Sequence, residues 1–191
     1  MHALRTALAL LLCMASATAL AQGLPSAASL RYSAQVSNGS AGGCGCFTMQ
    51  GAAGELVWPV RHPARIPGLG IVFDFGAEHV GQVGATGYGL TVATFTAGPR
   101  IALPSYRAVR PFAQATIGIA RGSGGQLPRD GTLLSTAGAF AFGLAVGADY
   151  PVNRYLSLRL LQLEVLHTDL PNNNSNWQNN LRIGTGVNFH R

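Results

Sequence analysis

The chain has 191 residues, of which 48% are apolar and only 10% are charged, and its formal net charge is +6. A typical soluble domain has about 25% charged residues, so this chain has too few charges to cover a water-exposed surface. Its basic residues are all arginines, scattered without a basic run. This argues against nucleic-acid binding and favours a protein whose outer face meets lipid.

The N-terminal segment has the three parts of a secretory signal peptide. A short basic start is followed by an apolar run over residues 6–20 and by the small residues Ala19 and Ala21. The run is shorter than the roughly 20 residues that cross a bilayer as a helix. We predict that residues 1–21 are the signal peptide and that residues 22–191 form one domain.

Eight segments of alternating apolar and small or polar residues follow, separated by turn-rich stretches. They cover residues 28–37, 47–58, 69–80, 88–103, 110–121, 136–150, 156–167 and 178–190. Several reach the roughly 9–11 residues that a tilted membrane strand needs, and an even count suits a closed antiparallel barrel. The predicted fold is an all-β, eight-stranded, antiparallel up-and-down transmembrane β-barrel.

The connections between these segments are of two kinds. Compact stretches with proline, arginine and an aromatic residue follow the second, fourth and sixth segments, at residues 59–67, 104–109 and 151–155. Looser stretches rich in Gly, Ser and Asn follow the others, at residues 38–46, 81–87, 122–135 and 168–177. Outer-membrane barrels have this asymmetry, with short periplasmic turns and longer outer loops.

The two faces of each strand differ in a way that indicates lipid outside. In the segment 136–150, Phe140 and Leu144 share one face, whereas Ala141 and Gly143 lie on the other. The bulky face is apolar, and the other face is small or charged. A soluble small barrel would have bulky apolar residues inside, while a membrane barrel has its apolar face outside.

Alternation places a set of charged and amide side chains on the inner face. The set is Arg31, Glu55, Asp74, Glu78, Arg100, Gln114, Asp149, Arg159, Gln162, Glu164 and Arg182. Four arginines nearly balance five carboxylates, and unpaired charges in a shielded lumen are costly. We predict an arginine–carboxylate network that closes the lumen as a polar plug. The change of face between Arg159 and Gln162 predicts a β-bulge near Leu160–Leu161, or an outward position for one of these leucines.

The last strand carries a pattern that resembles the insertion signal of bacterial outer-membrane barrels. Residues 182–189 read polar, any, glycine, any, any, apolar, any, aromatic, with Gly184, Val187 and Phe189 at the defining positions. This resemblance implies the barrel insertion machinery and periplasmic chaperones as partners during biogenesis, and the bacterial outer membrane as the destination.

Over residues 28–190 the chain resembles the small outer-membrane β-barrels related to the membrane domain of outer membrane protein A and the opacity proteins. Four runs, at residues 42–47, 72–76, 96–100 and 179–182, are similar to a subset from soil acidobacteria. The family implies outer-membrane lipids as surroundings, a salt-bridged lumen and variable loops. It does not imply an enzyme or one agreed role, and we expect neither a cofactor nor an enzymatic activity. We therefore expect a structural or surface-interaction role, with an unknown extracellular ligand for the loops.

Cys44 and Cys46 form the most distinctive local motif, in the first outer loop. Three states are open to them: a small structural disulfide, a pair of free thiols, or a metal or redox site. One such pair falls short of the roughly four ligands of a tetrahedral metal site.

Three alternative functions stay open. A narrow pore for small solutes would need a gap in the charge plug. A rim enzyme that modifies lipid would need a nucleophile near a base, for which Ser135 or Thr136 near His167 are the candidates, beside Glu164 and Asp169. A secreted soluble ligand-binding barrel is the third alternative.

Overall fold

The computed structural model describes residues 24–37, 47–60, 68–83, 87–129, 132–171 and 177–191. The predicted signal peptide at residues 1–21 lies outside the described residues, as do Cys44 and Cys46. None of the described residues belongs to a helix long and apolar enough to cross a membrane.

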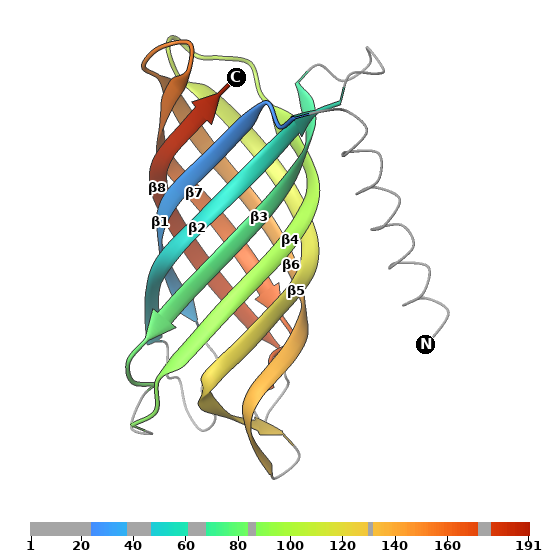
Figure 1. Ribbon diagram of the computed structural model, residues 1–191, viewed down its shortest axis with the longest axis vertical. Helices are drawn as coiled ribbons and strands as arrows, with labels where there is room; N and C mark the ends of the chain where they lie inside the picture. The colour runs from blue at the N-terminus through green and yellow to red at the C-terminus, as the bar shows by residue number, and fades with distance from the viewer. Residues whose placement is uncertain (1–23, 38–46, 61–67, 84–86, 130–131, 172–176) are drawn as a thin grey trace, which may run out of the picture.

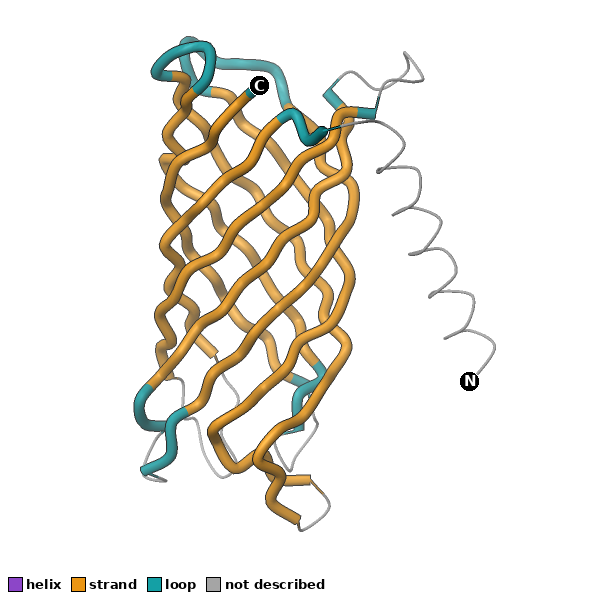
Figure 2. The backbone as a smooth tube through the Cα atoms, viewed as in Figure 1, coloured by secondary structure: helices purple, strands orange, loops and turns teal. Residues whose placement is uncertain are grey.

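The described chain folds into eight antiparallel strands that close into one barrel, as the sequence predicts (Figures 1 and 2). Each strand pairs with its neighbours in sequence, and β1 pairs with β8 to close the ring. The strands are β1 Ala27–Ser37, β2 Phe47–Pro59, β3 Leu69–Val80, β4 Leu90–Ala102, β5 Arg110–Arg129, β6 Thr132–Pro151, β7 Leu156–Thr168 and β8 Gln178–His190.

The predicted division into two faces is confirmed. On β6, Leu144 and Val146 point outward and are 51% and 55% exposed. Ala141 and Ala145 of the same strand point inward and are buried. Leucine, isoleucine, valine and phenylalanine side chains are exposed all round the outer surface. A contiguous apolar exterior of this kind is stable only against lipid.

One end of the barrel carries the compact turns, together with the start of β1 and the end of β8. We call it the turn end. Ala27 of β1 pairs there with His190 of β8. In the turn after β6, the Asn153 side chain accepts hydrogen bonds from the backbone N–H groups of Tyr155 and Leu156, at 2.8 and 2.9 Å. The Asn153 side chain thus satisfies backbone N–H groups that have no strand partner in this tight turn. The opposite end is called the loop end.

The prediction of a loose loop at residues 122–135 was wrong. β5 and β6 continue as a paired hairpin well beyond the other strands (Figure 1). The register shifts between Ser123 and Leu127, where Gly124 has a φ of 89°. The bulge bends the hairpin, and Leu127 beyond it is buried inside the barrel. Burial of that leucine explains why a glycine-rich stretch continues as strand.

The predicted irregularity in β7 is present. The pairing between β7 and β8 shifts between Arg159 and Gln162. Leu160 and Leu161 both point outward, with exposed fractions of 49% and 43%. The bulge thereby lets Arg159 and Gln162 both face the interior, although they are three residues apart.

Candidate functional site in the barrel interior

Glu55 is the centre of the charge network at the turn end of the interior. Its carboxylate forms ion pairs with Arg31 and Arg100, each at 2.8 Å, and with Arg159, and it accepts hydrogen bonds from the last two. The side-chain amides of Gln114 and Gln162 also donate to it, at 3.2 and 3.1 Å. One buried carboxylate on β2 therefore joins side chains from β1, β4, β5 and β7.

Arg182 on β8 is the second centre, closer to the loop end. Its guanidinium contacts the carboxylates of Glu78 at 3.2 Å, Glu164 at 3.3 Å and Asp74 at 3.5 Å. It also donates to the Thr94 hydroxyl at 3.1 Å. Arg182 is almost completely buried, so these contacts replace water around a full positive charge.

Arg31 joins the two centres, because it contacts both Glu55 and Asp74. Strand register sets these contacts: the carboxylates Glu55 and Asp74 lie opposite each other, within reach of Arg31, and Glu164 lies opposite its partner Arg182. Asp149 completes the set with contacts to Arg159 at 2.9 Å and to Arg100 at 3.4 Å. All the inner charged and amide side chains named from the sequence thus lie in one connected interior network.

Phe112 also lies inside the barrel and contacts this network. The sequence analysis did not identify it. It is 3% exposed, and the guanidinium groups of Arg100 and Arg159 lie 3.5 and 4.6 Å from its ring centroid. Both contacts have cation–π geometry. Gly147 leaves room for the ring, because a Cβ there would lie 2.4 Å from the phenylalanine.

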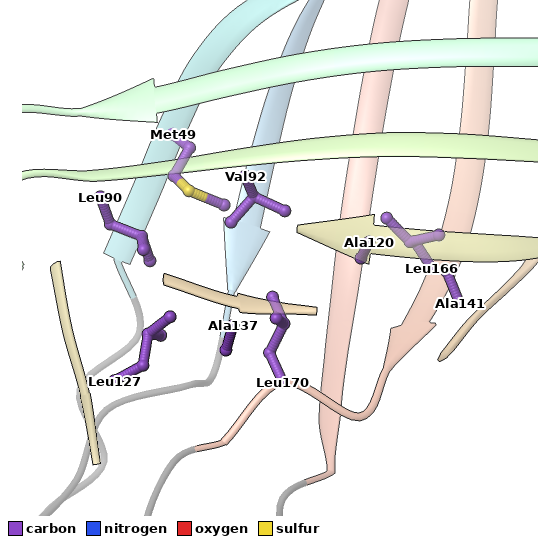
Figure 3. Packing of buried hydrophobic residues seen from close by; sticks show 9 residues of the cluster. All are labelled: Met49, Leu90, Val92, Ala120, Leu127, Ala137, Ala141, Leu166 and Leu170. Atoms are coloured by element: carbon purple, nitrogen blue, oxygen red, sulfur yellow. The ribbon is translucent and has the colours of Figure 1, made fainter. Parts of the chain in front are cut away.

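The loop end of the interior is filled by apolar side chains instead of charges (Figure 3). The cluster, called the apolar lid, consists of Met49, Leu90, Val92, Ala120, Leu127, Ala137, Ala141, Leu166 and Leu170. Its members come from β2, β4, β5, β6, β7 and the segment after β7. The sequence analysis missed this lid and predicted a plug made of polar groups only.

Buried amides hold the lid against β8. Asn180 donates to the backbone carbonyl of Leu166 at 3.1 Å, and Gln178 donates to that of Leu170 at 3.3 Å. These bonds fix the segment after β7 across the mouth, with Leu170 pointing into the barrel. The described interior thus holds a charge network and, toward the loop end, an apolar lid.

A cavity of about 150 Å³ opens at the turn end of the network. Its walls include Ser29, Arg100, Asp149, Asn188 and His190. This volume is large enough to hold several water molecules. Its walls also include Glu55 and Arg159, which form an ion pair with each other.

The rim residues considered for catalysis do not form a nucleophile–base pair. His167 contacts Asp169 at 3.1 Å and Asn179 at 2.8 Å. It lies opposite Phe142 on β6, which is about 20 Å along the strand from Thr136 at 3.3 Å per residue. Ser135 is one residue farther still. Within the described chain no group of three or more His, Cys, Asp or Glu side chains is placed to hold a metal ion.

The three residues of the C-terminal pattern occupy different faces of β8. Gly184 faces the interior, where a Cβ would lie 3.0 Å from the Arg31 side chain. Phe189 is 55% exposed on the outer surface near the turn end. Their role in insertion stays a prediction.

Comparison with solved structures identifies barrels of the same kind. Neisserial surface protein A (NspA) is 13% identical, with 86% of this chain and 96% of that chain covered and a TM-score of 0.66. The Yersinia pestis attachment invasion locus protein Ail is 13% identical, covering 87% and 100%, with a TM-score of 0.47. The outer membrane enzyme PagL is 15% identical, covering 82% and 97%, with a TM-score of 0.47.

The chain has the fold of the small outer-membrane β-barrels. The likeness to NspA, with a TM-score of 0.66 over nearly the whole of both chains, carries this statement. Neither a protein-family model nor a curated protein sequence matches the chain. The family resemblance seen in the sequence is thus confirmed at the level of fold.

Proposed function

We propose that this chain is an integral protein of the bacterial outer membrane with a structural or surface-interaction role and a lumen that does not conduct. The observation that carries the proposal is the filled interior. A charge network closes the middle and the turn end, and the apolar lid closes the loop end. We infer that together they leave no path for solutes between the two ends of the described barrel.

The proposed orientation places the turn end in the periplasm and the loop end outside the cell. Short periplasmic turns and longer outer loops are the rule for barrels of this fold. The secretory signal predicted at residues 1–21 and the C-terminal pattern with Gly184, Val187 and Phe189 agree with that route. The long β5–β6 hairpin then projects from the cell surface as the main candidate for contact with an extracellular partner.

No contact among the described residues favours the pore or the rim enzyme. A pore would need a gap in the network, yet Glu55 and Arg182 each hold several partners. A rim enzyme would need a hydroxyl near His167, and the hydroxyls considered lie far along β6. We also propose the narrower family assignment, in which the chain is similar to barrels from soil acidobacteria.

Heat modifiability of extracted outer membranes tests the membrane assignment. We expect a band in the outer-membrane fraction whose apparent mass shifts when the sample is boiled before denaturing electrophoresis. Closed barrels resist unfolding by detergent, because every strand is hydrogen-bonded on both sides. A soluble periplasmic protein without such a shift would contradict the proposal.

A further inference from the structure

An arginine stands on the lipid-facing surface near the loop end of β5. Arg121 is exposed and shares the outer face with Ile119. It forms no ion pair with any described residue, because five of the described carboxylates belong to the interior network and Asp169 contacts His167. The other exposed arginines of the described chain, such as Arg110 and Arg154, lie at the turn end.

The height of Arg121 matches the edge of the membrane. On β6 the outward side chains from Tyr150 to Phe140 are apolar or aromatic. Ten residue steps at about 3.3 Å, tilted by about 40°, give roughly 25 Å, the height of the apolar band of such barrels. Arg121 pairs with Gly138, the next outward position after Phe140. It therefore lies at the level of the lipid headgroups.

A groove opens beside this arginine. Gly138 faces outward, and a Cβ there would meet no atom within 4 Å. Gly138 lies in an open groove of about 700 Å³, with Ile119, Arg121, Thr136 and Phe140 among its walls. Its floor is backbone and small side chains, and its membrane side is flanked by Ile119 and Phe140. An acyl chain fits an apolar groove that runs into the bilayer from a charged edge.

A row of hydroxyl groups lies next to the arginine, on the side farther from the membrane centre. Thr91 of β4 pairs with Ser123 of β5, which pairs with Thr136 of β6. His79 extends the row, through a contact of 2.9 Å between its Nδ1 and the Thr91 hydroxyl. Hydroxyl and imidazole groups bind sugar hydroxyls and phosphate oxygens.

We propose that Arg121, the Gly138 groove and the hydroxyl row form a binding site for a phosphorylated, acylated sugar lipid of the outer leaflet. The guanidinium pairs with the lipid phosphate. The groove takes an acyl chain, and the hydroxyl row binds the sugar. This inference rests on the proposed outer-membrane location, and adds a particular lipid contact to it.

Native mass spectrometry of the folded full-length barrel tests the site. The protein, in neutral detergent, is titrated with diphosphorylated lipid A, with the same lipid after removal of its phosphates, and with phosphatidylglycerol. We expect one tightly bound diphosphorylated lipid A, with binding weakened about tenfold by Arg121→Ala, as for loss of a charged hydrogen bond. Gly138→Leu fills the groove while keeping the arginine, and is expected to weaken binding similarly.

Arg110→Ala is the matched control, since it removes an exposed arginine from the other end of the same strand. It should leave lipid A binding unchanged. Equal losses in Arg110→Ala and Arg121→Ala, or equal binding of the dephosphorylated lipid, would overturn the site. Binding of phosphatidylglycerol as tight as that of lipid A would overturn the sugar-lipid assignment. A heat-shifted gel band for each variant confirms folding, so a failed site is distinguishable from a failed membrane assignment.

Discussion

Replacing Glu55 with alanine is expected to lower the free energy of unfolding by about 3–5 kcal/mol, the typical cost of removing one partner from a buried ion pair. Glu55 is buried and forms ion pairs with Arg31, Arg100 and Arg159. Its loss leaves these buried guanidinium groups with less counter-charge. Denaturant unfolding of the barrel in detergent, followed by tryptophan fluorescence and by the heat-shifted band, measures the change.

Substitutions of two other carboxylates provide comparisons for the Glu55→Ala loss of unfolding free energy. Asp169→Ala removes an acid that is 46% exposed and paired only with His167 among the described contacts, so the expected change is under about 0.5 kcal/mol. Glu164→Ala, which removes contacts to Arg182 at 3.3 Å and Arg31 at 3.9 Å, should fall between the two. If Glu55→Ala unfolds like Asp169→Ala, the network does not hold the barrel together.

Leu166→Ala is expected to cost about 2–5 kcal/mol, the range for removal of a fully enclosed leucine side chain. Leu166 is 0% exposed and belongs to the apolar lid. Its side chain points into the barrel, so lipid does not fill the space that the mutation leaves. The same denaturant titration measures the loss.

Leu24→Ala is the matched control for this second substitution. Leu24 precedes β1 and is 68% exposed, so the same chemical change there should alter the unfolding free energy by less than about 0.5 kcal/mol. Equal effects of the two substitutions would show that the lid is not a packed cluster.

The strand order and the two faces could be predicted from sequence because a strand has a side-chain period of two. In each strand separately, the bulky apolar residues mark the outer face, so alternation places Glu55, Asp74, Arg31 and Arg182 inside. Which arginine contacts which carboxylate depends on register between strands. That register is fixed by pairing around the whole ring and is not visible in any one segment.

The apolar lid was harder to foresee, although part of its signal is present. Met49 shares the alternation of Glu55, and Leu166 shares that of Glu164. Read by parity alone, both face inward, but a bulky apolar residue on a membrane strand is usually expected to face lipid. Leu127 gave no such signal, because the bulge after Ser123 shifts the alternation.

The sealed interior is tested most directly by conductance of the purified, folded barrel in a planar lipid bilayer. With ion pairs across the lumen and the apolar lid at its mouth, we expect insertion without stepwise current at moderate voltage and salt. Reproducible unitary steps from the wild-type barrel would contradict a closed lumen and would favour the narrow pore.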